Sequence, residues 1–110
     1  MSFEADWQMI SERSGDAIFF EKVMKAAKVE AKRDGITLES AQELGLASHI
    51  SAMIRRGREG EALTIEDKAL FDEVSMDSLY LATRICGMVP GIHEDEKYLL
   101  STHFEIARLN

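Results

Sequence analysis

Two histidines carry most of the chemistry that this sequence offers. His49 and His103 each lie in an amphipathic segment, and a charged residue stands seven positions from each one. Arg56 follows His49, and Glu96 precedes His103. Seven residues are nearly two helical turns, so each charged residue shares a helix face with its histidine. We therefore expect the protein to act through these two imidazoles.

Each histidine also has a purely structural interpretation. Small residues flank His49, which suits the approach of another protein's reactive group, but a half-buried histidine bonded to a carbonyl has the same spacing. His103 stands at the margin of an apolar stripe, where a core-edge histidine needs only one satisfied ring nitrogen. Glu96 falls where an acid stabilises the positive end of a helix dipole. Spacing alone leaves these alternatives open.

Other reactive chemistry has little support. A helical metal site needs ligands at i, i+3 or i, i+4, and the three histidines have no such pairing, so we expect no metal and no cofactor. Cys86 is the only cysteine and lies in an apolar run, which predicts a small buried thiol rather than a nucleophile. His93 stands just before a predicted helix, as a solvated neighbour of its first turn.

Composition indicates one soluble domain. The chain has 110 residues, of which 45% are hydrophobic and 30% charged, with a single proline, a balance that favours an all-α protein. The net charge of −7 disfavours direct binding to nucleic acid. No apolar run is long enough to cross a membrane and no signal peptide stands at the N-terminus, so we expect a cytoplasmic protein.

Hydrophobic periodicity and capping residues predict a compact five-helix bundle. Residues 1–15 form a lead-in with room for a short helix, and residues 16–110 form the domain. Acidic and hydroxyl residues mark the starts of the helices, and glycine or proline marks their ends. The predicted helices cover residues 17–34, 40–56, 65–74, 76–89 and 94–109.

Both histidine segments resemble motifs of a known family. Residues 49–56, His-Ile-Ser-Ala-Met-Ile-Arg-Arg, resemble the first histidine motif of the PTS regulation domain, or PRD. Residues 94–104, Glu-Asp-Glu-Lys-Tyr-Leu-Leu-Ser-Thr-His-Phe, resemble the motif that closes the same domain. The resemblance covers roughly residues 16–110, with the two motifs in the family's order.

The resemblance implies a helical, usually dimeric domain that regulates transcription of sugar operons. Its histidines accept phosphoryl groups from carriers of the phosphoenolpyruvate-dependent sugar phosphotransferase system. Carried over to this chain, His49 and His103 are the acceptors, and Arg56 is the arginine that supports the phosphate. Family members often have aspartate where this chain has Ser48, and most carry a nucleic-acid-binding module. We therefore expect the output to pass through a homodimer or through a separate regulator protein.

Three functions follow, from different classes. The first is a phosphorylation-responsive, non-enzymatic regulatory module with His49 and His103 as acceptors and a phosphocarrier protein as partner. The second is a helical adaptor or subunit with structural histidines, whose partner binding survives their substitution. The third is a small enzyme that uses one of the histidines with Glu96 as an acid–base pair, which requires a substrate-sized pocket containing both groups.

Overall fold

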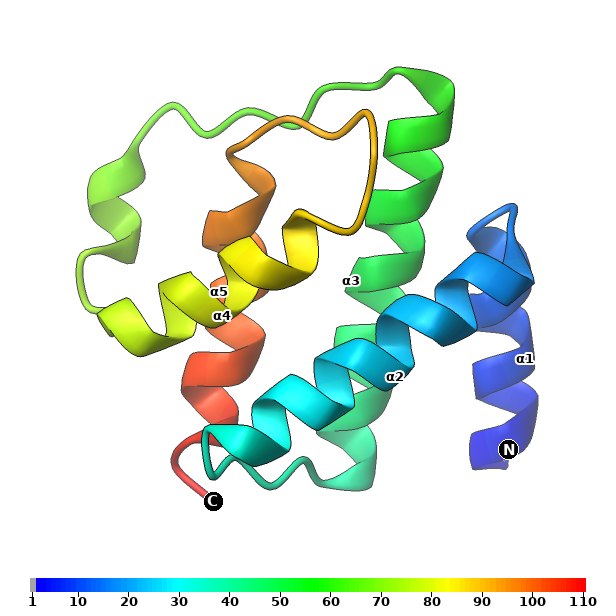
Figure 1. Cartoon of the computed structure of the whole chain (residues 1–110), viewed down its shortest axis with the longest axis horizontal. Coiled ribbons are helices and arrows are strands. Elements are labelled where there is room, and N and C mark those ends of the chain that lie inside the picture. The colour runs from blue at the N-terminus through cyan, green and yellow to red at the C-terminus, as the bar shows by residue number, and fades with distance from the viewer. Residues whose placement is uncertain (1) are drawn as a thin grey trace.

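The computed structural model describes residues 2–110, and these form five α-helices, one short 3₁₀ helix and no strand. Figure 1 shows the chain coloured from its N-terminus to its C-terminus. In chain order the elements are α1 (Phe3–Arg13), α2 (Ala17–Arg33), α3 (Ser40–Glu59), η1 (Lys68–Phe71), α4 (Met76–Cys86) and α5 (Glu96–Ala107). The all-α helical fold predicted from the sequence is confirmed, and no helix of residues 2–110 is long and apolar enough to cross a membrane.

Local sequence explains where the predicted helices begin and end. Asp16 caps α2, since its carboxylate accepts a hydrogen bond from the amide of Phe19 at 3.1 Å. Glu39 and Gln42 form a reciprocal capping box at the start of α3. Gly35, just after α2, has a φ of +76°, a left-handed conformation that side chains rarely adopt.

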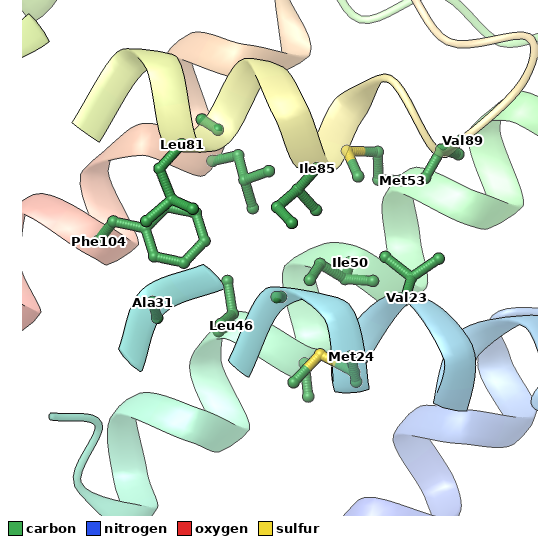
Figure 2. Packing of buried hydrophobic residues seen from close by; sticks show 14 of the residues in the cluster. Val23, Met24, Ala31, Leu46, Ile50, Met53, Leu81, Ile85, Val89 and Phe104 are labelled. Carbon is green, nitrogen blue, oxygen red and sulfur yellow. The ribbon is translucent and has the colours of Figure 1, made fainter. Parts of the chain in front are cut away.

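One core joins the helices. Its members recur at three- and four-residue spacing on α2, α3, α4 and α5, and Figure 2 shows these four helices contributing to it. Each large aliphatic or aromatic side chain that is fully buried contributes about 1.5–3 kcal/mol through removal from water. The fully buried side chains include Phe20, Met24, Leu46, Ile50, Met53, Leu81, Ile85, Leu100 and Phe104. This core fixes how α3 and α5 lie against each other.

The predicted helix over residues 65–74 is wrong. The structure has only η1 there, and no residue of that element is buried. The amide of Ile65 donates to Asp95 at 2.9 Å, so Thr64 does not begin a capped helix. A short helix that buries no apolar face lacks the packing that stabilises most helices in proteins.

The N-terminal lead-in instead forms a complete helix. Ser2 caps α1 by accepting from the amide of Ala5 at 3.1 Å. Ile10 of α1 is buried with the core, and its carbonyl accepts a 2.6 Å hydrogen bond from the buried hydroxyl of Ser51. The five α-helices are therefore not the predicted five, because α1 takes the place of the helix expected near residue 70.

Candidate functional site

Helices α3 and α5 bring the two histidines together. The rings of His49 and His103 lie with centroids 5.3 Å apart, at an interplanar angle of 65°. Neighbouring positions on both helices are fully buried, Ile50 beside His49 and Phe104 beside His103. Because the core holds these neighbours, it also fixes the direction in which each imidazole points. The two histidines therefore form an edge-to-face pair at the α3–α5 contact.

A buried ion pair lies next to the histidines. The guanidinium of Arg56 donates two hydrogen bonds to the carboxylate of Glu96, from Nε to Oε2 at 2.8 Å and from Nη2 to Oε1 at 2.7 Å. Glu96 is fully buried, and the side chain of Arg56 is 16% exposed. Such a two-pronged contact is among the strongest hydrogen-bonded pairings in proteins. The hydrogen bond to Glu96 accordingly raises the pKa of Arg56.

Glu96 has a larger role than its position in the sequence suggests. It is the first residue of α5, where an acid ordinarily faces solvent and stabilises the helix dipole. Here it faces α3 and holds Arg56 across 40 residues of sequence. The seven-residue spacings from His49 to Arg56 and from Glu96 to His103 were the available signal. They place each pair on one helix face, and the two faces meet.

His49 is held as a neutral imidazole. Its side chain is only 13% exposed, and its Nε2 atom is buried without a hydrogen-bond partner, 3.9 Å from Oε1 of Glu96. Burial is the main reason that the pKa of His49 is lowered to about 4, and the positive charges that His103 and Arg56 can carry contribute to the same decrease. Glu96 does not reverse this direction, because Arg56 already compensates its charge.

His103 lies against the backbone of α3. A side chain at Gly45 would place its first carbon 3.8 Å from both Cε1 and Nδ1 of His103, an ordinary contact distance. The ring of His103 therefore lies close to the backbone of α3 at Gly45. Burial lowers the pKa of His103 as well. Both imidazoles are thus biased toward the neutral form, in which one ring nitrogen carries a free lone pair.

The remaining reactive residues lie outside this cluster. His93 has a 37% exposed side chain, and its Nδ1 accepts a 3.1 Å hydrogen bond from the amide of Asp95. Cys86 is half-buried and faces the sulfur of Met53 at 3.9 Å. Burial raises the pKa of Cys86 to about 12, which keeps it a thiol. Within residues 2–110 no group of three or more metal-ligating side chains is close enough to hold an ion.

The cluster of two neutral imidazoles, one arginine and one glutamate has a limited range of chemistry. A neutral imidazole is a nucleophile or a proton acceptor, and a nearby guanidinium favours any anion that becomes attached to it. Five surface cavities formed by residues 2–110 are lined by neither His49 nor His103. The arrangement can therefore stabilise a small anionic group at one of the imidazoles.

Comparison with known proteins shows that a solved structure is closely similar to this chain. A PRD-containing transcription regulator from Lactobacillus casei ATCC 334 superposes with a TM-score of 0.87 at 31% sequence identity. The match covers 94% of this chain and 93% of the other. No family model matches the sequence, and no curated protein matches it.

Proposed function

Because this chain belongs to the family of PRD-containing regulators, we propose that it is a regulatory module that accepts phosphoryl groups on His49 and His103. The phosphoryl donor is a carrier protein of the sugar phosphotransferase system. A neutral ring nitrogen attacks the phosphorus atom, a nitrogen–phosphorus bond forms, and the bond to the carrier breaks. The protein itself catalyses no reaction on a small substrate.

The observation that carries this proposal is that the buried carboxylate of Glu96 binds the guanidinium of Arg56 and also faces the ring of His49. Arg56 is bound to Glu96, whose Oε1 lies 3.9 Å from Nε2 of His49. A phosphoryl group on the histidine pair adds about −1.5 to −2 of charge and three strong acceptor oxygens. That charge repels Glu96 and attracts Arg56. Phosphorylation therefore favours exchange of Arg56 from the carboxylate to the phosphate.

The two acceptors differ in access. Nε2 of His49 is a buried atom facing Glu96, so modification there requires the Arg56–Glu96 contact to open first. His103 is half-buried, and neither of its ring nitrogens is a buried atom that lacks a hydrogen-bond partner. We expect His103 to be modified faster in the arrangement described above. His49 becomes available once Arg56 has moved.

The output then passes through protein contacts in the cytoplasm. Exchange of Arg56 between Glu96 and phosphate gives the α3–α5 contact two arrangements, and a ligand or a partner can favour either one. A homodimer or a separate regulator protein would read the difference. The net charge of −7 makes direct contact with nucleic acid unfavourable.

Intact mass spectrometry tests phosphoryl acceptance directly. The protein is incubated with the general phosphotransferase components and phosphoenolpyruvate, alongside His49→Ala, His103→Ala and, as the matched control, His93→Ala. We expect an acid-labile phosphoryl adduct that His93→Ala retains and that one or both of the other variants lose. An adduct retained by the double variant of His49 and His103 would refute the assignment.

A second experiment tests Arg56. Arg56→Lys keeps the charge but cannot form the two-pronged contact, and Arg55→Lys is its exposed neighbour and control. We expect Arg56→Lys to shorten the lifetime of the phosphorylated protein, whereas Arg55→Lys leaves it unchanged. Equal lifetimes in both variants would remove Arg56 from the site.

One observation favours a different function. The nearly complete burial of His49 is also what a structural histidine in a helical adaptor would show. The two functions separate on the double substitution of His49 and His103. An adaptor would keep its partner binding and would take up no phosphoryl group from any carrier.

A further inference from the structure

Asp95 is a buried acid that the proposed phosphoryl transfer does not use. It precedes Glu96 directly in the chain and is 3% exposed. Its Oδ2 accepts a 2.9 Å hydrogen bond from the backbone amide of Ile65, and Nζ of Lys68 lies 3.5 Å from its Oδ1. Both partners belong to the segment 61–75, which connects α3 to α4. Asp95 therefore binds a segment 30 residues away in the sequence.

This use of Asp95 is unusual for its position. Asp95 is the N-cap residue of α5, where an aspartate ordinarily accepts hydrogen bonds from the first amides of its own helix. Here its side chain makes no capping hydrogen bond. The carboxylate is turned away from the helix that it precedes and toward the connecting segment. Its contribution is thus to the attachment of that segment rather than to α5.

Apart from its last residue, Ser75, which donates two hydrogen bonds to Glu105 of α5, the segment 61–75 has few other attachments. None of its residues is buried. The ring of Phe71 lies 5.6 Å from that of Tyr98, and Nζ of Lys68 lies 5.9 Å from the centroid of the same ring. Both contacts again reach the first turn of α5. Figure 1 shows the segment, in light green, passing beside the orange start of α5.

The start of the segment is also attached to Arg56, the other member of the ion pair. The amide of Glu61 donates a 2.9 Å hydrogen bond to the carbonyl of Arg56. One end of the segment is therefore attached to the backbone of Arg56, and its middle is attached to the residue next to Glu96. A movement of α3 relative to the first turn of α5 that separates Arg56 from Glu96 would therefore pull on both attachments.

We propose that Asp95 is a positioning residue that couples the Arg56–Glu96 pair to the segment 61–75. When the pair is closed, Asp95 holds Ile65 and Lys68 and the segment lies on α5. When Arg56 leaves Glu96, the first turn of α5 shifts and the segment is released. The inference rests on the proposed function, because phosphorylation is what opens the pair. It identifies the segment 61–75 as the part of the surface that changes as a result.

Hydrogen exchange on the full chain tests the attachment without any phosphoryl donor. Asp95→Asn removes the charge that Lys68 faces, and Glu94→Gln changes the exposed neighbouring acid as the matched control. We expect exchange in residues 61–75 to rise by about tenfold in Asp95→Asn, because the acceptor of the Ile65 hydrogen bond loses its charge and the bond weakens, and to stay unchanged in Glu94→Gln. Unchanged exchange in Asp95→Asn would overturn the proposal.

Lys68→Met is a second variant that keeps this test decisive. Lys68 is 53% exposed, so its substitution leaves the core intact, and we expect a smaller rise confined to the same residues. Protection in α2 and α4 shows in each sample that the fold persists. A rise that spreads equally over α2 and α4 would indicate general loosening and would also overturn the proposal.

Arg56→Lys tests the coupling. It weakens the pair without touching Asp95, and we expect faster exchange in residues 61–75 than in the Arg55→Lys control. If Asp95→Asn speeds exchange in residues 61–75 and Arg56→Lys does not, the segment is attached to Asp95 but is not coupled to the ion pair, and the inference is refuted. Because no sample is phosphorylated, failure of His49 and His103 to accept a phosphoryl group would overturn the proposed function and leave these results standing.

Discussion

Acid should destabilise this protein through His49 in a way that one substitution removes. The pKa of His49 falls from 6.5 to about 4 on folding, chiefly because the ring is buried. The unfolded chain therefore binds this proton at a higher pH than the folded protein does. Stability from the neutral imidazole is fully present above about pH 6.5, decreases as the pH falls, and is lost below about pH 4.

The size of the effect follows from the two pKa values. One pKa unit corresponds to about 1.4 kcal/mol, so the full difference corresponds to about 3 kcal/mol. About 2 kcal/mol of this is lost by about pH 5, where the unfolded histidine is largely protonated and the folded one is not. A domain of this size has a total stability of about 5–15 kcal/mol, so the loss is a large fraction of it.

Urea unfolding at about pH 7, 6 and 5 measures this difference. Trp7 is a suitable fluorescent probe because it packs against Phe20 in the core, with ring centroids 5.4 Å apart. His49→Gln removes the titrating group while the carboxylates that also titrate remain, and His93→Gln is the control at a more exposed histidine. We expect the wild type and His93→Gln to lose about 2 kcal/mol more than His49→Gln between about pH 7 and 5.

Nuclear magnetic resonance provides a direct check on the same reasoning. The ring protons of His49 should not titrate until the pH approaches about 4. A midpoint near 6.5, or parallel pH profiles for the wild type and His49→Gln, would refute the argument that burial keeps this imidazole neutral.

Three further predictions concern the surroundings of the site. Arg56→Met leaves the fully buried Glu96 without its partner and should lower the free energy of unfolding in urea by about 3–5 kcal/mol. The control Lys28→Met, at the more exposed pair with Glu43, should lower it by less than about 1 kcal/mol. Equal losses would contradict the burial argument. Gly57→Ala places its new carbon 2.3 Å from the carbonyl oxygen of Pro90 and should destabilise the protein by about 1–3 kcal/mol or more. Gly45→Ala meets only a 3.8 Å contact and should be neutral or stabilising by up to about 1 kcal/mol. The opposite order of the two variants in thermal unfolding would refute this description of the packing. Cys86 should resist alkylation in the native protein at about pH 8 and react once urea unfolds it, because its pKa is raised to about 12; rapid native labelling would contradict this.

Sequence patterns predicted the helices that bury an apolar stripe and failed where none is buried. α2 and α3 begin at capping residues and carry core residues at helical spacing, so both were recognised. The segment near residue 70 has helix-forming residues and a capping pattern, yet its Ile65 amide binds Asp95 instead. α1 was underestimated because its value to the fold comes from its contact with α3, which includes the hydrogen bond from Ser51 to Ile10.

The candidate site divides in the same way. By itself the sequence determined that His49 shares a face with Arg56 and that Glu96 shares a face with His103, because helical geometry converts a spacing of seven into adjacency. Only the tertiary structure decided that the two faces meet, that Arg56 binds Glu96 and that Asp95 holds the segment 61–75. The physical reason is that local backbone geometry sets contacts within a helix. Contacts between helices depend instead on how the whole core packs.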